Sequence, residues 1–184
     1  MATGQIISLL LRYYMLSHKY GEIKDGEKYL SMSKLAVNIY INSQISGFTC
    51  KINSNELCKS NLLYSDLKRN VFVPIWFEEY PLSIPNHVLN GHIFSMIGLY
   101  DLAYYNNSMA QTLYWFSFKS TEFMINLYDG GSHTFYDLGH WTNNLTPNVA
   151  RETYHNLHIK QLRFLNLTDQ SYIFTKTLKR WEKY

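Results

Sequence analysis

The stretch Trp76-Phe77-Glu78-Glu79-Tyr80-Pro81 runs on through Pro85 to Asn90-Gly91, and the rest of the chain is organised around it. Proline has no backbone N–H and pushes the preceding residue towards an extended conformation, so Tyr80 is predicted to lie outside any helix. A helical pattern follows at once. We therefore expect Glu79 and Tyr80 at the mouth of a helix bundle, where residues on a connecting segment can perform chemistry. The alternative is a loop whose aromatic side chains cover a core while its acids face water.

The composition is that of a globular protein. The 184 residues are 46% apolar and 17% charged, with 16 Tyr, 10 Phe and 4 Trp, which argues against disorder and favours an aromatic-lined cavity. We expect a single domain over residues 1–184. The formal net charge is only +3, the basic residues are scattered, and the chain has no phosphate-binding loop. No nucleic-acid partner is therefore predicted.

The two cysteines and the N-terminal apolar run indicate which metal sites and targeting segments can be expected. Cys50 and Cys58 lack the spacing of a zinc site, so no metal is predicted, and either a single disulfide or two small residues near a loop fits them. The apolar run from Ile6 to Leu11 is broken by Arg12. It is too short for a membrane span and lacks the basic region of a signal peptide. With no targeting segment of its own, the chain by itself is expected in the cytosol.

Apolar residues at helical spacing predict six helices. They cover Thr3 to Lys19, Glu27 to Ile41, Pro85 to Tyr104, Ser108 to Asn126, Asn148 to Arg163 and Ser171 to Glu182. The stretch from Gly47 to Asn70 has no clear period and is predicted to be a loop. The turn signal Asp129-Gly130-Gly131-Ser132 precedes a short extended piece, Thr134 to Tyr136. Six helices in sequential pairs predict an all-α fold of stacked αα-hairpins.

Two of these helices carry unusual faces. Gly91, Ser95 and Gly98 share one side of the third helix, and each mid-helix glycine costs about 0.8–1 kcal/mol relative to alanine. Close packing against a neighbouring helix is the expected reason. On the fifth helix, four polar side chains share one face: Arg151, Tyr154, His155 and His158. This face is either a polar site or a solvated surface with two ordinary histidines.

Short motifs from this chain form an ordered series. They are Trp76 to Pro81, Val88 to Gly91, Ile97 to Leu102, Leu127 to Asp129, Tyr136 to Leu138, Pro147-Asn148, Ala150-Arg151, Tyr154-His155 and His158-Ile159. In this order they resemble the C-terminal domain of the D-glucuronyl C5-epimerases, which act on heparan sulfate and heparin precursors. The resemblance is strong from about Trp76 to Trp181 and poor from Gly21 to Val73. It implies that the hairpins are part of an (α/α) toroid lining a sugar-binding cleft. It also implies a longer parent protein that is membrane-anchored in the Golgi lumen and homodimeric.

The resemblance implies conversion of D-glucuronate to L-iduronate at C5. This reaction removes a proton next to a carboxylate and returns one from the opposite face, so it needs a base, an acid and donors that stabilise an enediolate-like anion. It requires no cofactor and no metal. Matched residue by residue, the family's functional positions correspond to Glu79, Tyr80, Tyr136 and Tyr154 here. We expect Glu79 and Tyr154 to exchange protons on opposite faces, with Tyr80 and Tyr136 orienting or stabilising the uronate. Weaker candidates for substrate contact or support are Asn90, Arg151, His155 and His158.

One position departs from the family's pattern. Where members commonly read Tyr-Asp-Leu-Arg-His, this chain has Tyr136-Asp137-Leu138-Gly139-His140. The planar fork of arginine can bind both oxygens of a carboxylate, and glycine supplies nothing in its place. Two alternatives therefore stand beside the epimerase. One is a uronate polysaccharide lyase, which forms the same anion and then expels the 4-linked sugar. The other is a catalytically inactive carbohydrate-binding or scaffold remnant.

Overall fold

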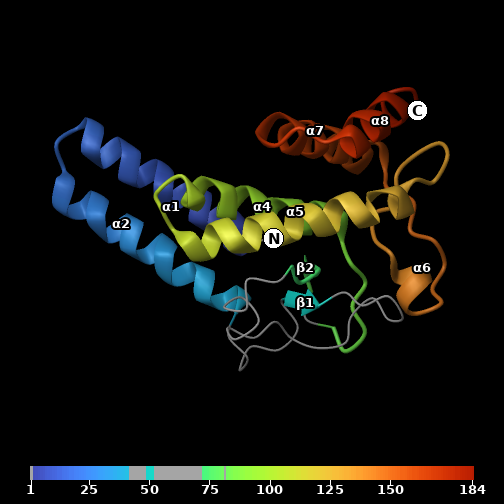
Figure 1. The fold of residues 1–184 in the computed structure, drawn as a ribbon, viewed down its shortest axis with the longest axis horizontal. Helices are drawn as coiled ribbons and strands as arrows, with labels where there is room; N and C mark the ends of the chain where they lie inside the picture. The colour runs from blue at the N-terminus through green and yellow to red at the C-terminus, as the bar shows by residue number, and fades with distance from the viewer. Residues whose placement is uncertain (1, 42–48, 52–71, 81) are drawn as a thin grey trace.

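The computed structural model describes residues 2–41, 49–51, 72–80 and 82–184. Most of these residues are helical and the helices pack against one another, so the predicted all-α class is confirmed (Figure 1). The elements are α1 Ala2–Lys19, α2 Ile23–Ala36, the 3-10 turn η1 Val37–Tyr40, β1 Thr49–Lys51, β2 Ile75–Phe77, α4 Leu89–Ala103, α5 Ser108–Met124, η2 Ile125–Tyr128, α6 Gly139–Thr142, α7 Glu152–Thr168 and α8 Tyr172–Trp181.

Helices α1 and α2 form an N-terminal hairpin, and α1 packs along α4. Gly21 closes the hairpin with a φ of +81°, a backbone region that glycine enters without steric cost. Where α1 crosses α4, a Cβ on Gly98 would lie 2.3 Å from the carbonyl oxygen of Gly4. The predicted close packing at Gly98 is therefore confirmed, because only glycine lets the two backbones approach so closely.

Helices α4 and α5 form the centre of the molecule. In Figure 1, α7 and α8 lie on one side of this central pair and the β1–β2 pair lies on the other. The core contains many fully buried aromatic and aliphatic side chains, and Trp76 is among the largest. Its indole ring stacks on the imidazole of His92 at 3.7 Å and 9°, and lies near-parallel to the ring of Tyr128 at 5.7 Å. This stack joins β2 to α4 and to η2.

Two helices begin later than predicted. Helix α4 starts at Leu89 rather than Pro85, because His87 adopts a φ of +53° that a right-handed helix does not allow. Helix α7 starts at Glu152 rather than Asn148 and continues to Thr168. The backbone before Glu152 pairs with another segment instead of forming a helical turn, because the carbonyl of Asn148 accepts a hydrogen bond from Tyr136 N at 2.7 Å. In the N-terminal part, α2 begins at Ile23, four residues before the predicted Glu27.

A short antiparallel pair, β1 with β2, was not predicted. Thr49 pairs with Phe77 and Lys51 with Ile75, so part of the stretch that we expected to be a loop forms a strand. The question of a disulfide between Cys50 and Cys58 lies outside the side chains that the structure describes, as does the conformation of Pro81. Among the described helices, none has the length and apolar character needed to cross a membrane.

Candidate functional site

Strand β2 delivers Glu79 and Tyr80 to the surface. The strand is held from two sides: Phe77 N donates to Nδ1 of His92 at 3.0 Å, and Ile75 N donates to Oγ of Ser120 at 2.8 Å. Burial lowers the pKa of His92 well below its ordinary value, so the ring stays neutral and its Nδ1 can accept. Tyr80, directly after this anchored strand, lies outside any helix and is 47% exposed, as predicted.

The first turn of α4 forms the surface on which Glu79 rests. A Cβ on Gly91 would lie 2.6 Å from Oε2 and 2.8 Å from Cβ of Glu79. Gly91 therefore makes room for the glutamate, and our expectation that it packs against a neighbouring helix was wrong. Within the described part of the chain, Oε2 of Glu79 is buried without a hydrogen-bond partner. The carboxylate of Glu79 is thus held against the first turn of α4.

Tyr136 is carried by a short extended segment, as predicted. Its backbone N–H donates to the carbonyl of Asn148 at 2.7 Å, and its carbonyl accepts from Leu89 N at 3.1 Å. Isolated bridges between Asp129 and Thr134 and between Phe135 and Val149 extend this pairing. Tyr136 is thereby fixed between the start of α4 and the segment that leads into α7.

Four side chains that the sequence predicted as catalytic come together here. The rings of Tyr136 and Tyr154 meet edge to face, with centroids 4.9 Å apart. The charge of Glu79 is the largest influence on the hydroxyl of Tyr80 and raises its pKa, with smaller effects from burial, Tyr136 and Tyr154. Burial, followed by the charge of Glu79, raises the pKa of Tyr136 above its ordinary value. Tyr80 and Tyr136 therefore stay protonated at neutral pH and present hydroxyl donors.

The remaining predicted residues lie differently. Arg151 is exposed at the N-cap of α7, whereas Asn90 is buried in the first turn of α4, where its carbonyl accepts from Nε2 of Gln161 at 3.1 Å. His155 and His158 are both buried on the inner side of α7. The face that they share with Tyr154 therefore runs from the surface into the core, and it is not a solvated surface.

Hydrogen bonds engage both histidines inside the protein. Nδ1 of His155 accepts from Thr134 N at 3.2 Å, which leaves its Nε2–H to donate to the carbonyl of Trp181 at 3.2 Å. Nδ1 of His158 lies 2.8 Å from Oγ1 of Thr134, and burial lowers its pKa to about 3. These contacts tie α7 to the segment before Tyr136 and to α8, so the structure does not bring the two imidazoles to the tyrosine cluster.

Sequence reasoning missed a buried pair next to the cluster. The side chain of Glu78 is 1% exposed, and its carboxylate meets Nδ1 of His87, whose own side chain is fully buried. No pattern in the sequence separates Glu78 from its neighbour Glu79, because residues 75–78 are all buried and the segment shows no period-two alternation.

Gly139 lies close to the cluster in sequence but has little free space. It is buried at the start of α6, and its N–H donates to Oδ1 of Asp137 at 2.9 Å. A Cβ at this position would lie 3.1 Å both from that oxygen and from Cδ1 of Leu145. A larger side chain therefore requires its neighbours to move by a few tenths of an ångström, but no backbone stands in its way.

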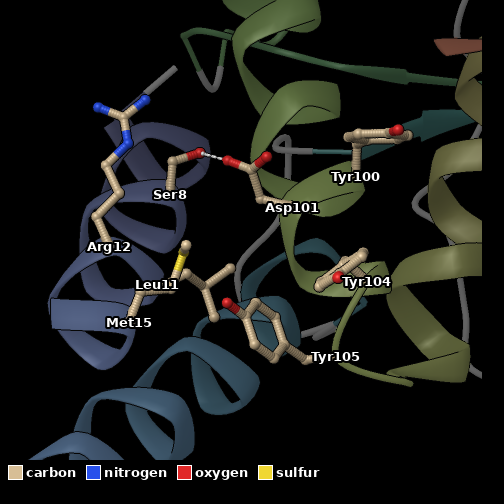
Figure 2. A pocket seen from close by; sticks show the side chains of 8 residues that line it. All are labelled: Ser8, Leu11, Arg12, Met15, Tyr100, Asp101, Tyr104 and Tyr105. Atoms are coloured by element: carbon tan, nitrogen blue, oxygen red, sulfur yellow. Dashed lines mark hydrogen bonds between the residues drawn. The ribbon is translucent and has the colours of Figure 1, made fainter. Parts of the chain in front are cut away.

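A cavity of about 390 Å³ lies away from the cluster, between α1 and the C-terminal half of α4 (Figure 2). Its lining includes Tyr104, Tyr105 and Arg12, and the hydroxyl of Ser8 donates to Asp101 across it at 2.5 Å. None of the predicted site residues lines it. In the part of the chain that the structure describes, no three His, Cys, Asp or Glu side chains gather as metal ligands would.

Comparison with known proteins identifies the family. The family model described as D-glucuronyl C5-epimerase C-terminus matches residues 1–183. The chain is 32% identical over 197 residues to a D-glucuronyl C5-epimerase of Caenorhabditis elegans, covering 100% of this chain and 28% of that protein. It is 29% identical over 164 residues to an uncharacterized protein of Methanocaldococcus jannaschii, covering 88% of this chain and 46% of that protein. The chain thus spans less than half of either relative. It belongs to the D-glucuronyl C5-epimerase C-terminus family.

Proposed function

We propose that this chain carries the catalytic groups of a uronate C5-epimerase, which converts D-glucuronate to L-iduronate in heparan sulfate and heparin precursors. The observation that supports this most is the meeting of Glu79, Tyr80, Tyr136 and Tyr154 at one place on the surface. A base, hydroxyl acids and hydroxyl donors are together what proton removal next to a carboxylate needs. These groups come from three separate parts of the chain.

Glu79 and Tyr154 exchange the two protons in this proposal. The carboxylate of Glu79 takes the C5 proton and breaks the C–H bond, whose electron pair moves into the carboxylate of the uronate as an enediolate-like anion. The hydroxyl of Tyr154, on a side chain that is 39% exposed, then donates a proton to C5 from the opposite face. In the reverse direction the two residues change roles.

Tyr80 and Tyr136 stabilise the anion. Their raised pKa values keep both hydroxyls protonated, so each can donate a hydrogen bond to the oxygens on which negative charge develops. The electrostatic cost of placing that charge near the carboxylate of Glu79 is lowest after Glu79 has accepted the C5 proton. The scheme needs no cofactor.

The complete protein supplies the wider setting in this proposal. Because the chain corresponds to 28% of the Caenorhabditis elegans relative, the remaining walls of the polysaccharide cleft belong to other parts of a longer protein. The Golgi lumen, a membrane anchor and a homodimer are proposed for that longer protein only. Arg151, exposed beside Tyr154, is available for the acidic polysaccharide.

Hydrogen exchange at C5 tests the proposal. We suggest a chimera in which this chain replaces the matched segment of the Caenorhabditis elegans epimerase, assayed in deuterated water on N-sulfated heparosan. The substitutions Glu79→Gln and Tyr154→Phe should each lower the exchange rate by about 10²–10⁴-fold. Glu122→Gln and Tyr104→Phe are matched controls that make the same chemical changes elsewhere, and they should leave the rate unchanged.

Other outcomes support the alternatives. An unsaturated uronate product would identify a lyase, because the same anion would then have expelled its 4-linked sugar. Binding of heparosan without exchange or elimination would identify an inactive carbohydrate-binding remnant. Full exchange by the Glu79→Gln chimera would contradict the assignment of the base.

A further inference from the structure

Glu78 precedes the proposed base in the chain, and its side chain is buried. Its side chain is 1% exposed, whereas Glu79 is partly exposed next to Tyr80. The two residues are adjacent in the chain, directly after strand β2. A contact that fixes the side chain of Glu78 therefore also restricts where Glu79 can lie.

His87 binds both oxygens of the Glu78 carboxylate. Its backbone N–H donates to Oε2 at 3.1 Å, and its Nδ1 makes a short contact with Oε1. The imidazole is fully buried and lies edge-on to the indole of Trp76, with ring centroids 5.7 Å apart. The carbonyl of His87 also accepts from the hydroxyl of Tyr128 at 2.6 Å. The buried pair therefore has few other conformations open to it.

The same short segment is hydrogen-bonded to the backbone that carries Tyr136. Leu138 N donates to the carbonyl of Asn86 at 2.7 Å, and Leu89 N donates to the carbonyl of Tyr136 at 3.1 Å. His87 lies between these two bonds, at a φ of +53°. The contact between Glu78 and His87 therefore joins the segment of Glu79 and Tyr80 to the segment of Tyr136.

We propose that Glu78 and His87 are positioning residues, which hold Glu79 and Tyr80 in register with Tyr136 without touching the substrate. This inference deepens the proposed function and rests on it for its catalytic meaning. The positioning role can be tested without any activity, because it concerns where Tyr80 lies relative to Glu79. Misplacing a catalytic group by about 1 Å can cost on the order of a hundredfold in rate.

The backbone of His87 allows a matched pair of variants. Glycine and asparagine both tolerate positive φ, so His87→Gly and His87→Asn each suit the native backbone. Asparagine carries Nδ2 on Cγ, where histidine carries Nδ1, and can still donate to Glu78. Glycine removes the side-chain contact altogether. Glu78→Gln weakens the same contact from the other side, and Glu122→Gln is the control for a loss of charge.

The readout is the titration of Tyr80, followed by NMR in a chain with 13Cζ-labelled tyrosines and assigned with Tyr80→Phe. The charge of Glu79 and burial are the main influences on this hydroxyl. His87→Gly and His87→Asn both leave the charge of Glu78 in place, so a difference between these two variants in the pKa of Tyr80 reports displacement and not a lost charge. We expect a fall towards the ordinary value for His87→Gly and Glu78→Gln, and the parent value for His87→Asn and Glu122→Gln.

Activity provides the second readout. In the chimera, His87→Gly should lower kcat for C5 exchange by on the order of a hundredfold at unchanged KM, with recovery in His87→Asn. If the parent chimera shows no exchange, the proposed function fails, and the NMR titration still decides the positioning role. Folded His87→Gly and Glu78→Gln chains in which Tyr80 titrates as in the parent would overturn the inference. Failure of both variants to fold would also overturn it, because the pair would then serve folding alone.

Discussion

Gly139 is the residue at which this chain departs from the family's pattern, and its surroundings allow a direct test. We expect Gly139→Arg in the chimera to tighten binding of heparosan oligosaccharides about tenfold or more, since charged hydrogen bonds contribute about 1.5–3 kcal/mol. The new Cβ must displace Leu145 and the oxygen of Asp137 slightly. The free energy of unfolding should therefore fall by about 1–3 kcal/mol.

Gly139→Ala separates these two effects, because it adds the same Cβ without a guanidinium group. Alanine should lower the free energy of unfolding without improving the Kd. In the 184-residue chain alone, the gain from arginine should be smaller, since the uronate is less well held there. Equal affinities of the arginine and alanine chimeras, measured by calorimetry, would show that Gly139 is not the missing carboxylate contact.

At the scale of the element, helix α4 has two glycines with different tasks. In Gly91→Ala, the added Cβ would lie 2.6 Å from Oε2 and 2.8 Å from Cβ of Glu79. The segment that carries Glu79 must therefore shift, and we expect the free energy of unfolding to fall by about 1 kcal/mol, since the higher helix propensity of alanine offsets part of the loss. C5 exchange in the chimera should fall by on the order of a hundredfold, because Glu79 is displaced.

Gly98→Ala is the matched comparison on the same helix. Its Cβ would lie 2.3 Å from the backbone oxygen of Gly4, which cannot move without separating α1 from α4. Chemical denaturation should show a loss of about 1–3 kcal/mol for this variant, larger than that of Gly91→Ala. If Gly91→Ala kept full exchange, the close contact between Glu79 and α4 would be irrelevant to the chemistry.

At the scale of the whole molecule, buried histidines make stability depend on pH. Burial lowers the pKa of His158 from 6.5 to about 3 and that of His92 well below 6.5. Below pH 6.5 the unfolded chain therefore binds more protons than the folded chain, and the free energy of unfolding falls as the pH drops towards the folded pKa. Each histidine should contribute about 1.4 kcal/mol per pH unit across that window.

His158→Asn isolates one of these contributions. Asparagine places Nδ2 near the position of Nδ1, so the contact with Thr134 can be kept while the titration is removed. Denaturation curves at pH values from about 7 to about 4 should show a slope lower by about 1.4 kcal/mol per pH unit in the variant. Parallel slopes for variant and parent would mean that His158 becomes protonated in the folded protein without cost.

The sequence by itself determined the all-α class, most of α1, α5 and α8, the position of Tyr80 outside any helix and the short extended piece at Tyr136, while the family resemblance named the four residues that we propose as the site. Helical periodicity and proline act over a few neighbouring residues, so they can be read without knowing the fold. The burial of Glu78, the inward direction of His158 and the delayed start of α7 were decided only by the tertiary structure. Each depends on partners far away in the chain, namely His87, Thr134 and Tyr136. Gly91 is a further example, because its spacing with Gly98 predicted that a neighbouring helix packs closely there, and only the fold revealed that the side chain of Glu79 fills the space.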